Sequence, residues 1–164
     1  KDTSGIMLIA KTLAAKKYLQ QQFKDRLVSK HYLALVRGRL VPPEAKIDLP
    51  IGRSRSQPVK RSVVAGGKQA STMYRIVEQF DGFCLADIEL LTGRTHQIRV
   101  HFAHLGHPVA GDELYGGPKL KGLSRQFLHA GKLELTSPSG AQLSLTSPLP
   151  PELQAVLTSL RSGL

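Results

Sequence analysis

The sequence has no tryptophan, one cysteine and few aromatic residues, which make up 5% of its 164 residues. A single cysteine cannot form an internal disulfide, so a disulfide scaffold is excluded and a reducing compartment, the cytoplasm, is expected. No apolar run approaches the ~20 residues of a membrane-spanning helix, so no membrane partner is expected. Cys84 itself lies in an alternating apolar run, which favours a small buried core residue over a catalytic thiol.

Acidic residues are also scarce, because 12 aspartates and glutamates face 23 lysines and arginines, for a formal net charge of +11. The excess is concentrated between Lys11 and Arg61, where 13 cationic side chains and three acidic ones give +10. A basic surface attracts a polyanion by counterion release and by steering. The charge therefore favours a nucleic-acid partner over a merely basic protein, and it does not distinguish RNA from DNA.

Hydrophobic periodicity predicts strands and helices in an irregular order. The near-continuous apolar run at 5–10 is expected to form a central strand. Thr12 is a candidate N-cap, and Leu19 and Phe23 are expected to face inward from the helix that follows. The other expected strands are 28–36, 46–51, 69–80, 83–91, 127–135 and 141–146, and the expected helices are 13–24, 95–105 and 152–160. This pattern predicts an α+β fold, one domain over residues 1–164, with a mainly antiparallel central sheet and flanking helices.

A change of period marks the candidate site. The strand that begins after the Asp81-Gly82 turn ends at Thr92-Gly93, and a helix begins near Thr95, its candidate N-cap, and stops at Gly106. Arg94 therefore lies at a strand-to-helix turn, beside a helix N-terminus. A guanidinium and free backbone N–H groups both favour an anion there.

Two further features are open to two interpretations each. The basic segment 53–61, Arg-Ser-Arg-Ser-Gln-Pro-Val-Lys-Arg, is either a phosphate-gripping segment or a solvated loop. Tyr32 is either an ordinary half-buried strand tyrosine or a ring that stacks on a base, with a phenol that can exchange a proton.

Four histidines gather near the predicted helix 95–105: His96, His101, His104 and His107. His101 and His104 share a helix face, but no carboxylate or thiol completes a set of metal ligands. Structural or RNA-facing histidines are therefore favoured over zinc, and no metal site is expected. A metal-dependent hydrolase remains a weak alternative.

Several segments together resemble the RNA pseudouridine synthases of ribosomal and transfer RNA, in the branch typified by the A, C and D enzymes that modify large-subunit rRNA. The most specific segment is Thr-Gly-Arg-Thr-His-Gln-Ile-Arg-Val-His at 92–101. The others, in family order, are Thr-Ser-Gly at 3–5, Ala-Lys-Thr at 10–12, Lys-His-Tyr-Leu-Ala-Leu-Val-Arg-Gly at 30–38, Gly-Lys-Gln-Ala-Ser-Thr at 67–72, Gly-His-Pro-Val at 106–109, Gly-Asp at 111–112, Tyr-Gly at 115–116 and Phe-Leu-His-Ala at 127–130.

The resemblance implies a cofactor-free isomerase that breaks the N-glycosidic bond of a uridine in RNA, turns the uracil and rejoins it through C5. It implies a cleft across the middle of the sheet and a structured RNA substrate, ribosomal RNA before transfer RNA; a monomer is the simplest oligomeric state. Arg94 would pair with an essential aspartate and keep it ionised, and Tyr32 would stack on the target base. RNA contacts are expected at Lys30, Arg53, Arg55, Lys60, Arg61, Lys68 and Arg99.

One part of the family pattern is not found. The family's catalytic aspartate ends a His-Arg-Leu-Asp motif two residues before Thr-Ser-Gly, so it would directly precede Lys1, and Asp2 is out of register. We therefore expect an N-terminally incomplete chain that binds RNA but does not turn over without that aspartate. The alternative from another class is a non-catalytic RNA-binding or assembly module that needs only the basic surface.

Overall fold

The computed structural model describes residues 1–54 and 57–163. Along this part of the chain the strands are β1 (Ser4–Gly5), β2 (Ser29–Arg37), β3 (Glu44–Asp48), β4 (Ile51–Arg53), β5 (Arg61–Val63), β6 (Ser71–Phe80), β7 (Phe83–Leu90), β8 (Leu128–Thr136) and β9 (Gln142–Thr146). The helices are α1 (Leu13–Lys24), α2 (Gln97–His104) and α3 (Pro151–Arg161), with a short 3-10 helix, η1, at Glu113–Tyr115.

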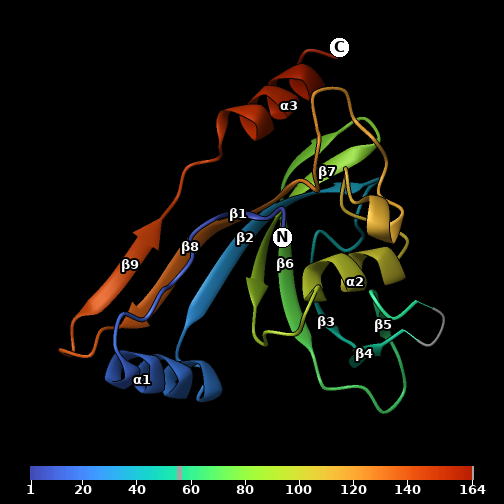
Figure 1. Ribbon diagram of the computed structural model, residues 1–164. Helices are drawn as coiled ribbons and strands as arrows, with labels where there is room; N and C mark the ends of the chain where they lie inside the picture. Colours follow the sequence, from blue (N-terminus) through green and yellow to red (C-terminus); the bar gives the residue numbers. More distant parts are fainter. Residues whose placement is uncertain (55–56, 164) are drawn as a thin grey trace.

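A seven-stranded sheet organises the molecule (Figure 1). Its hydrogen-bonded neighbours follow the order β1-β8-β2-β7-β6-β3, and β9 pairs with β8. Only β1 runs parallel to its neighbour among the described strands of this sheet. Strands β4 and β5 form a separate two-stranded hairpin. The predicted α+β fold with a mainly antiparallel sheet is confirmed.

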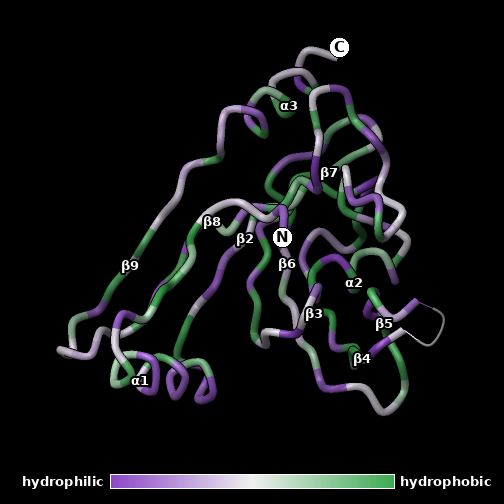
Figure 2. The backbone as a smooth tube through the Cα atoms, viewed as in Figure 1, coloured by the Kyte–Doolittle hydropathy of each residue, from purple (hydrophilic) through white to green (hydrophobic). Residues whose placement is uncertain are grey.

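The two faces of the sheet carry separate hydrophobic clusters. Ala34 packs on one face with Phe102 of α2, and Leu35 packs on the other face with Leu153 of α3. Neighbouring residues on a strand point to opposite faces, which is why one strand serves both clusters. Figure 2 shows apolar residues recurring along the central strands. Full burial of a side chain such as Phe102 contributes about 1.5–3 kcal/mol.

Residues 5–10 do not form the predicted central strand. In this N-terminal segment the strand pairing with β8 ends at Gly5. From Lys132 onward the same edge of β8 pairs with β9. The segment continues without strand pairing, with Met7 77% and Ile9 74% exposed. The apolar run was a poor guide because only alternate side chains of the segment pack against the sheet.

Two other predictions about element ends are wrong. The expected strand 46–51 is divided between β3 and β4, because Pro50 lies between them and has no N–H to donate to a ladder. The expected N-cap Thr95 is not the cap of α2. His96 occupies that position in the left-handed conformation, with φ 58°, and makes no side-chain cap.

Other local predictions are confirmed. The Thr12 hydroxyl caps α1 by accepting the N–H of Ala15 at 3.1 Å. The Asp81-Gly82 turn joins β6 to β7 in an antiparallel hairpin. Gly106 follows α2 with φ 82°, and Cys84 is buried. No helix within the described residues is long and apolar enough to cross a bilayer.

Candidate active site

Gln97 fixes the turn between β7 and α2. Its amide oxygen accepts hydrogen bonds from the Thr92 hydroxyl at 2.7 Å and from the backbone N–H of Arg94 at 2.9 Å. Its amide nitrogen donates to the Ser71 carbonyl and to the Thr72 hydroxyl on β6, both at 2.9 Å. The amide is buried and all four of its hydrogen-bonding positions are used, so the turn that carries Arg94 is firmly held.

His101 extends this buried network. Its Nε2 lies 3.0 Å from the Leu49 carbonyl, which can only accept, so Nε2 carries the proton. The Thr72 hydroxyl accepts from Gln97 and therefore donates to His101 Nδ1, at 2.9 Å. Burial lowers the pKa of His101. This histidine is a neutral part of the scaffold.

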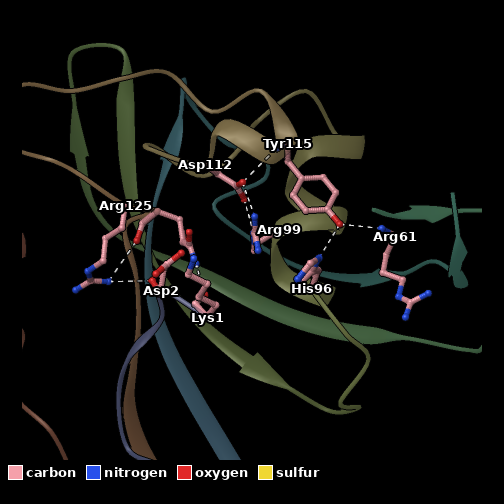
Figure 3. A network of polar contacts seen from close by, with 9 residues as sticks. Lys1, Asp2, Arg61, His96, Arg99, Asp112, Tyr115 and Arg125 are labelled. Carbon is pink, nitrogen blue, oxygen red and sulfur yellow. Dashed lines mark hydrogen bonds and ion pairs between the residues drawn. The ribbon is translucent and has the colours of Figure 1, made fainter. Parts of the chain in front are cut away.

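Arg99 on α2 is held by a buried carboxylate. Its Nε and one terminal nitrogen donate to the two carboxylate oxygens of Asp112 at 2.6 and 2.7 Å (Figure 3). The Asp112 side chain is 0% exposed and that of Arg99 11%. The guanidinium also lies over the Tyr115 ring, 4.9 Å from its centroid. Burial opposes the charge, but Asp112 outweighs it and raises the pKa of the Arg99 guanidinium.

Tyr115 joins the β4–β5 hairpin to the start of α2. Its hydroxyl oxygen accepts the backbone N–H of Arg61 on β5 at 2.9 Å and lies 2.9 Å from His96 Nδ1 (Figure 3). Burial, and then the nearby charge of Arg99, lowers the pKa of His96. The phenol oxygen therefore links the backbone of β5 to the His96 imidazole.

The N-terminal segment lies beside this network. Lys1, Tyr32, Arg94, His96 and Arg99 line one pocket of about 220 Å³. The charge of Asp2 favours the ionised Arg99. In Figure 3, Lys1 and Asp2 appear between Arg125 and Arg99.

Tyr32 occupies the middle of the sheet, between Ile88 of β7 and Ala130 of β8. The β2–β8 register is irregular at His31/Tyr32, so the ladder is locally interrupted there. Burial raises the pKa of the Tyr32 phenol. Tyr32 and Arg94 line two pockets together, so the structure brings these two predicted site residues to one place.

The other predicted site residues are distributed around this place. Three of them line a pocket of about 470 Å³ together with Arg94: Arg53, Arg61 and Lys68. Lys60 is in the turn of the same hairpin, where its N–H donates to the Gln57 carbonyl at 2.9 Å. Arg99 is apart from that pocket and is engaged by Asp112. Arg55 lies outside the described residues.

Lys30 lines a larger pocket of about 800 Å³ between α1, β2 and the turn before α2. Phe23 lines it as well and is 43% exposed, so the prediction that Phe23 faces inward is wrong. Gln22 takes the buried position instead. Its amide exchanges hydrogen bonds with the backbone N–H and carbonyl of Thr136 on β8, which makes its burial tolerable.

The histidines do not assemble a metal site. Across residues 1–54 and 57–163, no group of three or more His, Cys, Asp or Glu is arranged to hold a metal ion. His101 is bonded within the core, His96 meets Tyr115, and His107 Nδ1 donates to the Arg37 carbonyl at 2.9 Å.

Sequence reasoning did not assign roles to Gln97, Asp112 or Tyr115. All three lie inside the segments that carry the resemblance, so a signal was present. Their pairing was not visible, because Asp112 reaches Arg99 across a helix end and two turns. Such contacts depend on the tertiary fold.

The fold and these segments define an enzyme family of RNA modification. A family model described as RNA pseudouridylate synthase matches residues 1–104, and the chain belongs to this family. It is 44% identical over 171 residues to ribosomal large subunit pseudouridine synthase D of Nitrosomonas europaea, covering 99% of this chain and 49% of that protein. It is 46% identical over 164 residues to an uncharacterized RNA pseudouridine synthase of Chloroflexus aurantiacus, covering 98% and 51%. The chain thus spans about half the length of these curated relatives.

Solved structures agree with this assignment. Human RNA pseudouridylate synthase domain containing 1 superposes with a TM-score of 0.75 at 29% identity, covering 93% of this chain and 74% of that one. Human RNA pseudouridylate synthase domain containing 4 gives a TM-score of 0.75 at 25% identity, covering 92% and 69%.

Proposed function

We propose that this chain is the larger part of the catalytic domain of an RNA pseudouridine synthase, which isomerises uridine to pseudouridine in structured RNA. The observation that carries the proposal is the central pocket that Tyr32, Arg94 and Arg99 line beside Lys1. Two larger cationic pockets adjoin it, and Arg94 lines all three. A reactive base withdrawn from its stack needs such a small pocket within a basic surface.

The chemistry requires an aspartate that the family pattern puts directly before Lys1. This carboxylate either attacks C1′ of the ribose or assists glycal formation. A residue joined to the amino group of Lys1 would start from the rim of the central pocket. The 164-residue chain alone is expected to bind RNA and to make no pseudouridine.

Two cations are candidates for the partner of that carboxylate. The resemblance assigns the role to Arg94, whose side chain is exposed and whose Nε donates to the Gln69 carbonyl at 2.9 Å. The contacts favour Arg99, because it is nearly buried, is oriented by Asp112 and already interacts with the charge of Asp2. An ion pair is strongest where water is excluded and the guanidinium is fixed.

Tyr32 is proposed to stack on the target uracil. Its half-buried ring is a rigid platform at the centre of the sheet. The phenol keeps its proton at neutral pH, because the ordinary pKa of tyrosine is about 10 and burial raises it further. Proton acceptance by Tyr32 would therefore need prior deprotonation, and Tyr32→Phe separates the ring's role from the phenol's.

The substrate proposed first is large-subunit ribosomal RNA, with transfer RNA second. Support comes from the printed name of the Nitrosomonas relative, a ribosomal large subunit enzyme. The reaction proposed needs no cofactor or metal. A cytoplasmic location is proposed, since the single cysteine cannot form an internal disulfide and is free. A monomer is proposed as the simplest oligomeric state.

The test uses a longer chain that carries His-Arg-Leu-Asp ahead of Lys1. We expect it to form pseudouridine in unmodified large-subunit rRNA in single-turnover assays. Arg99→Lys should slow the reaction at least about 100-fold, because lysine keeps the charge but cannot reproduce the fixed, two-donor geometry of the guanidinium, and losing one oriented donor at such a site costs about 3 kcal/mol. Arg94→Ala should slow the reaction less. Arg161→Ala, which removes an exposed cation paired with Glu78, is the control. If the unaltered longer chain forms no pseudouridine in the rRNA, the proposed enzymatic function is wrong.

The alternative function is a non-catalytic RNA-binding module. The cationic pocket of Arg53, Arg61 and Lys68 favours it, since it serves binding without any aspartate. RNA affinity of the longer chain without pseudouridine formation would support this alternative.

A further inference from the structure

The pocket of about 800 Å³ between α1 and β2 has the chemistry of a nucleotide site. Its lining includes four cations, two aromatic rings and no acidic residue; the cations and rings are Lys24, Arg26, Lys30, Arg94, Phe23 and Tyr32. Its volume is that of sites that hold small organic molecules. Cations that follow a backbone and rings that stack on bases are the usual components of single-strand RNA sites.

Phe23 is the feature of this pocket that packing does not explain. It lies in the last turn of α1, and the buried position of that turn is occupied by Gln22. The Phe23 ring instead faces the pocket, with the Lys30 ammonium 5.7 Å from its centroid. An exposed ring beside a cation offers a base both stacking and a counter-charge for its phosphate.

The end of α1 keeps negative charge out of this pocket. Asp25 caps the helix, and its carboxylate accepts two hydrogen bonds from the Gln21 amide at 2.9 and 2.8 Å, away from the lining. Arg26 then adopts the left-handed conformation, with φ 60°, and contributes to the lining. Such a conformation is unfavourable for a residue other than glycine, so the chain bends at a local cost where it brings Arg26 to the pocket.

The pocket adjoins the central one, because Tyr32, Leu90 and Arg94 line both. We propose that it binds the nucleotide next to the target uridine, with the base stacked on Phe23 and the phosphate among Lys24, Arg26 and Lys30. This inference rests on the proposed function, since it assigns a second subsite to the unpaired strand that carries the target uridine in the same structured RNA.

The experiment measures binding of a fluorescein-labelled uridine hexanucleotide to the 164-residue chain by fluorescence anisotropy. Phe23→Ala and Phe23→Leu should each weaken the affinity about tenfold, and Phe23→Trp should keep it within about twofold, since stacking on a base requires an aromatic ring. Lys24→Gln and Arg26→Gln should each lower the salt dependence of log affinity by about 0.7. Leu27→Ala, at an exposed apolar side chain outside the lining, is the matched control.

The outcomes separate this subsite from the proposed function. If Phe23→Ala or Phe23→Leu binds the hexanucleotide as tightly as the unaltered chain, the proposed subsite is wrong. Either result would mean that the Phe23 ring does not stack on a base. If the unaltered chain does not bind the hexanucleotide, both the subsite and RNA binding by this surface fail. Thermal melting of each variant verifies the fold, and the comparison of Leu with Trp at position 23 holds even if Phe23→Ala unfolds.

Discussion

The turn before α2 and the β4–β5 hairpin are both rich in polar side chains, yet they use them in opposite ways. Around α2, the amide of Gln97, the imidazole of His101 and the carboxylate of Asp112 are buried and fully bonded to other protein groups. On the hairpin side, Arg53 and Lys68 are exposed and face a pocket. Burial turns polar groups into a rigid scaffold, whereas exposure keeps them available for a partner.

Asp112→Ala should have the largest effect on the scaffold. It leaves the Arg99 guanidinium nearly buried without its counter-charge, which should lower the free energy of unfolding by about 3–5 kcal/mol in urea titrations. Glu113→Ala is the control, since Glu113 forms an exposed pair with Lys119 and should cost less than about 1 kcal/mol. Equal losses in the two variants would contradict the scaffold role.

Gln97→Leu should cause the second-largest loss of unfolding free energy. It removes the acceptor of the Arg94 N–H and of the Thr92 hydroxyl proton, and the donor to the Thr72 hydroxyl, at a cost of about 2–3 kcal/mol in the same titrations. Gln142→Leu on β9 is the matched control, because the Gln142 amide is exposed and, among the described residues, donates to the Thr136 hydroxyl alone, at 3.0 Å. A loss below about 1 kcal/mol for Gln97→Leu would show that the turn does not depend on this network.

Acid should destabilise the scaffold by a smaller amount. Folding lowers the pKa of His101 through burial, so the unfolded chain binds more protons and stability rises with pH. This contribution is complete above the unfolded pKa of about 6.5 and is lost as pH falls towards the folded value. His101→Gln should flatten urea-monitored stability between about pH 7 and pH 5. If the unfolding free energy of His101→Gln falls with pH as steeply as that of the unaltered chain, the acid sensitivity comes from another titratable group, such as His96.

Replacing hairpin charges should have the smallest effect on folding. Arg53→Gln, Lys60→Gln and Arg61→Gln combined should change the free energy of unfolding by less than about 0.5 kcal/mol. The same variant should reduce the salt dependence of log RNA affinity by about 0.7 for each lost phosphate contact. The backbone N–H of Arg61 still reaches Tyr115, so the link to the site is kept. An unaltered salt slope would mean that the hairpin does not touch phosphate.

Local signals predicted much of the fold. The Thr12 cap, the Asp81-Gly82 hairpin and the Gly106 stop depend on residues close in sequence, and all three are present. The position of Arg94 between β7 and α2 followed from the change of period, and the structure agrees.

Features that depend on competition between distant segments were not predictable. Residues 5–10 could not be judged without knowing that β9 takes the edge of β8. Phe23 was expected to face inward as an apolar residue one helical turn from Leu19. Gln22 takes the buried position instead, because its amide forms two hydrogen bonds with the Thr136 backbone. The pairing of Arg99 with Asp112 joins residues from α2 and the segment before η1. In each case a tertiary contact outweighed the local pattern.

The Tyr115 hydroxyl, which contacts both His96 and Arg61, connects protonation of His96 to the position of β5. The same oxygen meets Arg61 of β5 and His96 of the central pocket. If the hairpin binds RNA as proposed and the bound strand displaces β5, the hydrogen bond between the Tyr115 phenol and His96 changes, and so does the proton affinity of that imidazole. By thermodynamic linkage, protonation of His96 must change the affinity of the hairpin for that strand by the same factor. In that case the pH dependence of RNA binding would report on the contact between Tyr115 and His96, which the RNA itself does not make.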